Sequence, residues 1–443
     1  MTKVTVDTDG YRNQAFICRL NYVLTFIQNH PNSPDHVHFS INEHESANLT
    51  IHYSIKGGTY HIIPQKVFFE PSINSKLKVS EHKFQYKELS LKGFAHHGGS
   101  AFIEFDIFET IFFHISRYEE RNVQPDQLDQ HGSMTSIEHY LVKNKMHTFP
   151  IADLLVYYFF EKLGLKPNQV VTNYTLTHDI DSIHKYPSFY KFLRGYGNIA
   201  LYQDHKIKNF VRHSLNYVEY MIGTKTDPYD TFDWLLIKNN DKVNQKIIYW
   251  LTGGNTIYEG FFNIHNPKVY NTIHVAKGRG YKIGLHPSYD TISNASMMRQ
   301  ERFQLCHVSS EDILDSRQHF LRFDIQNTGK ILDELGIKTD SSLGYRDRIG
   351  FRCGTGFPYH LYDFDRECAF KFVEIPLIVM DIAAMREIKW DSAAWCLNIS
   401  AFIEKNNMHT HITFNFHNSF FDPTLVDVFL LKKWYIATFH PSE

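Results

Sequence analysis

The sequence predicts an α/β protein with a largely parallel sheet, closed into a barrel or a distorted barrel. Short β-rich runs alternate with helix-length segments from Val170–Thr177 to His411–Phe416. Acidic residues, histidines and arginines follow several of these runs directly. Because functional groups in such folds gather at the carboxyl ends of the strands, these polar residues predict a functional site there.

The length of the chain limits how it can be organised into domains. A length of 443 residues exceeds the ~250–300 residues that one hydrophobic core serves, so we predict two domains. The first domain, residues 1–168, is predicted to be mixed α/β. The second, residues 169–443, carries the predicted barrel, with a helical insertion at about 183–244 that is too long for a simple crossover and would cap the sheet edge.

Several classes of protein are disfavoured. The net charge of −2 gives no general attraction to nucleic acid or to an anionic membrane, local basic patches excepted. The apolar run Leu154–Phe160 is far shorter than the ~20 residues of a membrane span, and the N-terminus lacks signal-peptide features. Five scattered cysteines without a CxxC pair favour neither a disulfide framework nor a thiolate zinc site. We expect a cytoplasmic protein without integral membrane segments or a nucleic-acid partner.

The first domain shows both helical and strand periodicity. Apolar spacing predicts helices over Ala15–Gln28 and Phe102–Arg117, whereas Asn48–Ser54 alternates like a strand. Pro150 suits the first position of another helix. The segment His96–Gly99 (HHGG) could be read as metal-binding, but a loop is the preferred interpretation.

The second domain contains six predicted strands. Each is a short apolar or β-branched run, bounded by glycine or by polar residues. They are Val170–Thr177, Ile247–Leu251, Tyr281–Leu285, Ile337–Asp340, Phe370–Met380 and His411–Phe416.

Asp179 and Asp181 follow the first of these strands. If the strand continues, residues two apart share a face, so both carboxylates can reach one site. One could hold a metal while the other moves protons. A helix N-cap is the alternative, although one aspartate would suffice for it.

His286 and Asp290 follow the third strand. Pro287 suits a helix start, which would bring the two side chains, four residues apart, onto one helical face. An imidazole and a carboxylate at that spacing can bind a divalent metal. A hydrogen bond between them at a helix start is the alternative.

Arginine and histidine mark three further segments. The loop Gly344–Gly356 carries three arginines among four glycines, which favours a functional loop over surface ion pairing. His417 ends an aromatic-rich strand. The cluster Arg317, His319 and Arg322 could meet a phosphate, but a solvated helix face is the preferred interpretation.

Taken together, four motifs resemble those of the polysaccharide deacetylase (NodB-homology) superfamily, and they occur in the same order. They are Thr177–Asp181, His286–Asp290, Phe351–Thr355 and Phe416-His417. The resemblance runs from about Val170 to the C-terminus and implies a deformed (β/α) barrel. Residues 1–165 resemble an uncharacterised domain found ahead of such deacetylases in bacteria of the Bacteroidetes type. We expect this domain to pack on the barrel and to shape substrate access.

The resemblance also implies residue roles. Asp179 would be the general base, Asp181 and His286 metal ligands, and His417 the general acid. Arg352 would pair with and orient Asp179, and Asp381 is a weaker candidate for tuning His417. Asp290 stands where the superfamily usually has a second histidine ligand, Ser182 stands where a glycine is usual, and the arginine loop lacks its usual proline.

These roles predict a metal-dependent hydrolase that removes N-acetyl or O-acetyl groups from a carbohydrate. Zinc is the default metal, with manganese, iron, cobalt or nickel as alternatives because Asp290 would make the site harder and more anionic. The expected substrate is an N-acetylated sugar or glycoconjugate. Two other functions stay open, a non-catalytic relative that binds a glycan or a partner and an amidase acting on a non-sugar C–N bond.

Overall fold

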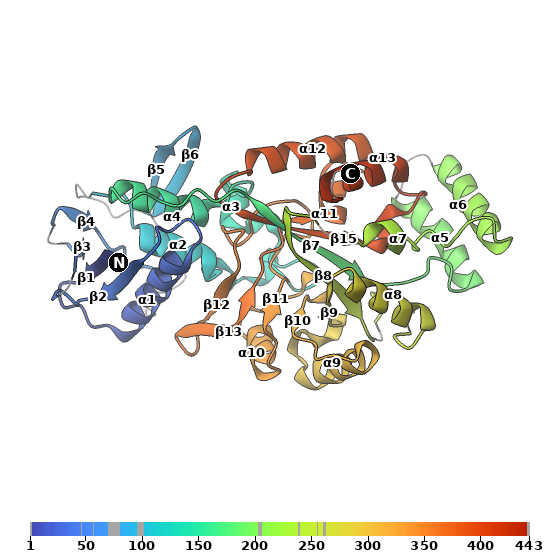
Figure 1. Cartoon of the computed structure of the whole chain (residues 1–443), viewed down its shortest axis with the longest axis horizontal. Coiled ribbons are helices and arrows are strands. Elements are labelled where there is room, and N and C mark those ends of the chain that lie inside the picture. The colour runs from blue at the N-terminus through green and yellow to red at the C-terminus, as the bar shows by residue number, and fades with distance from the viewer. Residues whose placement is uncertain are drawn as a thin grey trace.

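The computed structural model describes residues 2–45, 47–55, 57–69, 80–94, 102–202, 206–237, 240–254, 256–259 and 263–440. The segment His96–Gly99 lies outside these ranges. The molecule is elongated, with the N-terminal elements at one end, a large sheet in the middle and the helices α5 and α6 at the other end (Figure 1).

The N-terminal region contains a four-stranded parallel sheet in the order β2-β1-β3-β4 and an antiparallel hairpin, β5-β6. The helix predicted over Ala15–Gln28 and the strand predicted over Asn48–Ser54 are confirmed as α1 and β3. The third predicted element, from Phe102, begins only at Ile107, because the Asp106 side chain caps the helix there. The elements are β1 (Thr2–Asp7), α1 (Gln14–Asn29), β2 (Val37–Ile41), β3 (Leu49–Tyr53), β4 (Tyr60–Ile62), β5 (Glu81–Tyr86), β6 (Leu89–Phe94), α2 (Ile107–Ile115), η1 (Tyr118–Glu120), η2 (Pro125–Gln127), η3 (Ser136–Glu138), α3 (Tyr140–Lys143) and α4 (Ile151–Lys162).

The central sheet has nine strands in the order β12-β13-β11-β10-β9-β8-β7-β15-β14. Every neighbouring pair is parallel except β12 and β13, so the prediction of a largely parallel sheet is confirmed. No ladder among the described residues joins β14 to β12, and closure into a barrel stays a prediction. The strands are β7 (Asn173–Ile180), β8 (Val243–Leu251), β9 (Lys282–His286), β10 (Asp315–Ser316), β11 (Thr339–Asp340), β12 (Tyr359–Asp363), β13 (Cys368–Glu374), β14 (Val379–Met380) and β15 (His411–His417).

Helices connect these strands and lie around the sheet (Figure 1). Three of them, α5 to α7, lie between β7 and β8, within the segment predicted as a helical insertion. The helices are α5 (Phe189–Tyr202), α6 (Lys206–Met221), α7 (Phe232–Leu235), α8 (Pro267–Gly278), η4 (Tyr289–Ser293), α9 (Ala295–Ser309), η5 (His319–Leu321), α10 (Asn327–Glu334), α11 (Asp381–Glu387), α12 (Ser392–Lys405), η6 (Asn418–Phe421) and α13 (Val428–Phe439).

The strand predicted over Phe370–Met380 is in fact two strands. β13 ends at Glu374 and pairs with β11 and β12, whereas β14 lies at the opposite edge of the sheet, beside β15. Pro376 stands between them and has no N–H to donate to a ladder. The chain therefore leaves the sheet at this proline and re-enters it on the far side.

The N-terminal region packs directly against the region of the large sheet. The Arg117 guanidinium donates a hydrogen bond to the carbonyl of Arg352, and Arg19 forms an ion pair with Glu367. Buried aromatic rings from both regions also meet, for example Phe112 and Tyr362. The domain boundary at 168 stays a prediction; the four-stranded sheet and the β5-β6 hairpin precede it, and the nine-stranded sheet follows it.

None of the helices described by the structure is both long enough and apolar enough to span a membrane.

Candidate active site

Polar side chains converge at the carboxyl ends of β7, β9 and β15. In the sheet register His417 lies opposite Asp179, and His286 ends β9 two strands away from β7. Both carboxyl groups predicted after β7 face this site, because β7 continues through Ile180 and keeps Asp179 and Asp181 on one side. The structure thus brings together four of the six predicted site residues.

Asp181, His286 and His319 form a group that can hold a metal ion. Their ligand atoms all lie within 4.8 Å of one another. The Asp181 Oδ1 atom is buried without a well-formed hydrogen bond, and it lies 3.3 Å from His286 Nε2 and 3.9 Å from His319 Nε2. Ligand atoms that are ~2.0–2.1 Å from a tetrahedral zinc ion are themselves about 3.3–3.5 Å apart, so the separation of Asp181 and His286 already fits such an ion, and that of Asp181 and His319 would have to shorten by about 0.5 Å.

The surroundings of both histidines aim Nε2 at the site. His286 Nδ1 donates a hydrogen bond to the Arg317 carbonyl at 2.6 Å, which leaves Nε2 free to face the metal-binding group. His319 Nδ1 lies 3.7 Å from a buried carboxylate oxygen of Glu259. A hydrogen-bonded acceptor such as the Arg317 carbonyl orients a metal-binding imidazole and raises its basicity, whereas the distance from His319 Nδ1 to Glu259 is too long for a hydrogen bond.

The backbone around His319 is strained. Phe320 and Leu321 have φ angles of 58° and 49°, in the left-handed region that residues other than glycine rarely adopt. Each such residue costs on the order of 1–3 kcal/mol, and strain of this kind gathers at functional sites. The left-handed turn directly follows the ring that faces Asp181.

Asp179 is buried and held from two sides. Arg317 Nη1 donates to one carboxylate oxygen at 3.0 Å, and Asn415 Nδ2 donates to the other at 2.7 Å. Burial alone would raise the pKa of Asp179, but Arg317, together with the charges of His286 and His417, lowers it below the ordinary value. The carboxylate is therefore ionised and fixed in direction.

His417 is held by Asp381. Its Nδ1 lies 2.8 Å from Asp381 Oδ1, and its backbone N–H donates to Asp381 Oδ2 at 2.6 Å. Burial opposes a positive charge on the ring, yet the charge and hydrogen bond of Asp381 raise the pKa of His417 to about 10. His417 Nε2 faces the site, 3.8 Å from Asp179 and 3.9 Å from Asp181.

The prediction that Arg352 pairs with Asp179 is wrong. Arg352 Nε and Nη2 donate to the two carboxylate oxygens of Glu120 in the N-terminal region, at 3.0 and 2.6 Å, and Nη1 donates to the Gly344 carbonyl. The Arg352 guanidinium points away from β7 because it pairs with the buried Glu120 carboxylate at the contact between the two regions. Arg317, which follows β10, occupies the position beside Asp179 instead.

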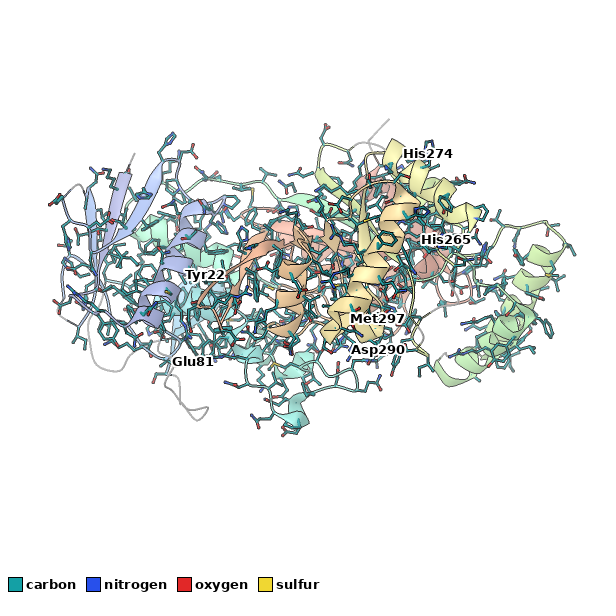
Figure 2. All side chains as sticks on the ribbon, turned by 90° about the horizontal axis from the view of Figure 1, so that it is seen from below. Tyr22, Glu81, His265, His274, Asp290 and Met297 are labelled. Atoms are coloured by element: carbon teal, nitrogen blue, oxygen red, sulfur yellow. The ribbon has the colours of Figure 1, made fainter. Side chains whose placement is uncertain are left out.

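The predicted helical pairing of His286 with Asp290 is also wrong. His286 is the last residue of β9, and a 3₁₀ turn starts only at Tyr289, so the two side chains do not share a helical face. Asp290 is exposed (Figure 2). His319 takes the third position of the metal-binding group.

Arg317, His319 and Asn415 are the site residues that sequence reasoning missed or misplaced. The first two were interpreted as a solvated helix face, but both are buried at the end of β10. β10 has only two residues, too few to produce a strand signal. Asn415 lies within the predicted strand that ends at His417, and its two-residue spacing from His417 was the available signal.

Two cavities open at the site. The first, of about 140 Å³, is lined by the metal-binding group and Asp179, together with Phe320 and Arg386. The second, of about 610 Å³, is lined by residues of the segment 129–139 and of the arginine loop. Phe320, Arg346 and Arg386 line both cavities, so the N-terminal region forms part of the approach to the site.

Comparisons with known proteins found one family model and several solved structures that resemble this chain. Residues 10–166 match a family model described as a family of unknown function, DUF7033. No curated protein matches the chain. A solved structure from Mycobacterium smegmatis, provisionally described as a polysaccharide deacetylase, matches at 14% identity and a TM-score of 0.33, over 60% of this chain and 84% of that one. A polysaccharide deacetylase from Bacillus cereus matches at 8% identity and a TM-score of 0.28, over 61% and 92% of the two chains. At such TM-scores the likeness carries no argument, and the function must be argued from the site.

Proposed function

We propose that this chain is a metal-dependent deacetylase that removes an N-acetyl or O-acetyl group from a carbohydrate. The observation that carries the proposal is the arrangement of three functions around one cavity. A metal-binding group lies in the middle, an ionised carboxylate lies on one side, and a positively charged imidazole lies on the other. This is the set of groups that hydrolysis of an acetamide or an acetate ester requires.

Asp181, His286 and His319 would hold the divalent metal, with zinc as the default. A metal bound there supplies a Lewis acid for the acetyl carbonyl and lowers the pKa of a coordinated water. Three protein ligands leave a coordination position open, which distinguishes catalytic from structural zinc sites. The buried, hydrogen-bond-deficient Asp181 oxygen supports this assignment.

Asp179 would act as the general base. Arg317 keeps it ionised, and Asn415 fixes the direction of its second oxygen, the one that lies 4.0 Å from His286 Nε2. A base at this position can accept the proton of a water molecule held beside the metal ligands.

His417 would act as the general acid. An amine is a poor leaving group unless it is protonated, and the raised pKa of His417 keeps a proton on the ring at neutral pH. Asp381 accepts a hydrogen bond from His417 Nδ1, and this contact directs His417 Nε2 toward the substrate cavity. The same parts would serve an amidase for non-sugar substrates, so the choice of a sugar rests on the sequence resemblance.

The test is metal content and acetate release, measured on the full chain and on four variants. Asp181→Ala, His286→Ala and His319→Ala should each lower metal affinity by at least about a hundredfold, since even loss of an outer partner costs 10–100-fold. Asp290→Ala is the matched control, because it removes an exposed carboxylate three residues beyond Pro287, and it should retain the metal.

Acetate release from N-acetylated and O-acetylated sugars then tests the reaction. Release by the metal-loaded parent and its loss in the three ligand variants supports the proposal. Turnover of simple acylated amines but not of sugars would favour the amidase. Metal loss in Asp290→Ala but not in His319→Ala would overturn the assigned ligands, and absence of any bound metal would favour a non-catalytic binding protein.

A further inference from the structure

The two cavities at the candidate site differ in size. The inner cavity, of about 140 Å³, contains the metal-binding group, whereas the outer cavity measures about 610 Å³. Pockets for small ligands measure about 300–1,000 Å³, so the inner cavity suits an acetyl group, and the remainder of a sugar would extend into the outer one. Phe320, Arg346 and Arg386 line both cavities, and they therefore lie where the unreactive part of a substrate would pass.

Arg386 is an unpaired cation at this junction. It lies in the last turn of α11, and its side chain is exposed. Among the residues that the structure describes, its guanidinium has neither an ion pair nor a hydrogen bond. All its donors are therefore available to a ligand in the two cavities.

The acidic residues that line the outer cavity do not balance this charge, because both already have a basic partner. A third arginine of the lining, Arg352, is paired in the same way. The pairs are Asp129 with Arg346, Asp347 with Arg348, and Glu120 with Arg352. The positive charge of Arg386 is thus left without compensation.

Arg346 and His131, two further residues of this lining, indicate the same excess of positive charge. Arg346 pairs with Asp129 through Nη2, but its Nη1 is buried and has no hydrogen-bond partner among the described residues. Burial lowers the pKa of His131. Three nearby arginines lower it further, although Asp129 opposes them, and they are Arg346, Arg322 and Arg386. An anion in the cavity would supply the missing acceptor and offset the excess charge.

Aromatic rings complete the wall of the outer cavity. The rings of Tyr258 and Phe320 line it with their centroids 5.1 Å apart, and Tyr258 stacks on Tyr289 at 4.3 Å. Such rings offer apolar contact area, whereas a guanidinium can bind a phosphate or a carboxylate through two parallel hydrogen bonds. The wall therefore suits a sugar that carries an acidic group.

We propose that Arg386 binds a negatively charged group of the substrate, a proposal that rests on the proposed function and specifies its substrate class as an acidic carbohydrate. The charged group is a phosphate or a carboxylate, since the guanidinium fits both. Arg346 Nη1 would supply a second donor, and the two side chains form the anion site. Because Arg386 and the metal-binding group line the same small cavity, the charge lies on the acetylated sugar unit or on the unit next to it.

The experiment compares acetate release by the metal-loaded full chain from three sugars. N-acetylglucosamine is neutral, its 1-phosphate carries a phosphate, and N-acetylmuramic acid carries a carboxylate. The parent should show a kcat/KM at least about tenfold higher for one or both charged sugars, and the preferred sugar identifies the anion. Arg386→Gln should lower that kcat/KM about 10–100-fold, chiefly through KM, because it removes a hydrogen bond to a charged group. It should leave turnover of the neutral sugar unchanged.

Arg299→Gln is the matched control, because it removes the same charge from an exposed arginine on α9, and it should behave like the parent. Arg386→Lys keeps the charge but not the two parallel donors, so it should recover part of the loss. Equal kcat/KM of the parent for all three sugars, or an equal effect of Arg386→Gln on all three, would overturn the proposal.

Sugar binding to the metal-free protein distinguishes the anion site from the proposed function. Isothermal titration calorimetry should show one or both charged sugars binding at least about tenfold more tightly than N-acetylglucosamine to the parent, and Arg386→Gln should abolish this preference. If the preference is found but no sugar releases acetate, the anion site stands and the deacetylase is wrong. If acetate is released without any preference for a charged sugar, the deacetylase stands and the anion site is wrong.

Discussion

Two strands in this molecule end in the same pattern, but only one of them reaches a candidate site. β1 of the small sheet ends in Asp7 and is followed by Thr8-Asp9, and β7 of the large sheet carries Asp179 and is followed by Asp181. Both sheets are parallel at these strands. In both registers the first aspartate lies opposite a histidine of the neighbouring strand, His52 or His417.

The difference lies in burial and in what the neighbours supply. β1 stops at Asp7, whose carboxylate accepts a hydrogen bond from the Asp9 backbone, and Asp9 is exposed in a left-handed turn. β7 continues one residue beyond Asp179, which is only 2% exposed, and the neighbouring strands bring in two buried histidines and an arginine. A pair of aspartates after a strand is thus a site only where a wide sheet brings further polar strand ends together.

Asp179→Asn should show the largest effect. It keeps the side-chain volume but removes the proposed base, so activity should fall by about 10²–10⁴-fold while metal content stays unchanged. Acetate release and elemental analysis measure the two quantities. Asp7→Asn is the equivalent change at β1 and should alter neither. Equal losses of activity in Asp179→Asn and Asp7→Asn would contradict the distinction drawn between the two strand ends.

Arg317→Met should lower both stability and activity. It leaves the buried Asp179 carboxylate without its cation, which should cost on the order of 3–5 kcal/mol of unfolding free energy. The pKa of Asp179 is lowered in the folded protein, so its contribution to stability is present above the unfolded value and is lost as the pH falls. In the variant this pKa rises, and the acidic limb of the pH–activity profile should move to higher pH.

Urea unfolding and the pH–activity profile measure these effects, and Arg317→Lys is the control because it keeps the charge. An unchanged acidic limb in Arg317→Met would show that another group keeps Asp179 ionised.

Arg352→Met should lower stability without changing the chemistry. The side chains of Arg352 and Glu120 are both buried, and removing Arg352 leaves Arg117 as the remaining cation beside Glu120, so the cost should be about 1–3 kcal/mol, less than that of a fully unpaired charge. Denaturant unfolding should show this loss, and Arg352→Lys, which keeps a positive charge beside Glu120, should show a smaller one. Metal content and the acidic limb should match those of the parent. If Arg352→Met instead moved the acidic limb of the pH–activity profile as Arg317→Met does, Arg352 would have a role at Asp179 after all.

His417 should give the most gradual effect, a change of stability with pH in the metal-free protein. Its pKa is raised to about 10, so the stabilisation by Asp381 is fully present below the ordinary value of ~6.5 and is lost as the pH rises toward about 10. His417→Gln should flatten the unfolding free energy across this range. NMR titration of the His417 ring in the parent and in Asp381→Asn, where the pKa should fall, checks the cause.

The sequence by itself determined the long strands and the residues at their ends. Buried β-rich runs predicted β7 and β15, and parallel strands bring their carboxyl ends to one edge, so Asp179, Asp181, His286 and His417 could be expected to meet. Their spacing along each strand is a local property that the chain carries with it. The helix α1 and the strand β3 were predicted in the same way.

Only the tertiary structure decided the third member of the metal-binding group and the arginine beside Asp179. Arg317 and His319 follow β10, a two-residue strand without periodicity, and sheet pairing with β9 and β11 places them. Arg352 carries the stronger sequence motif, but the packing of the N-terminal region gives it Glu120 as a partner. Apolar periodicity reports the local backbone, whereas the partner of a charge depends on which distant segment is buried against it, and that is set by the fold as a whole.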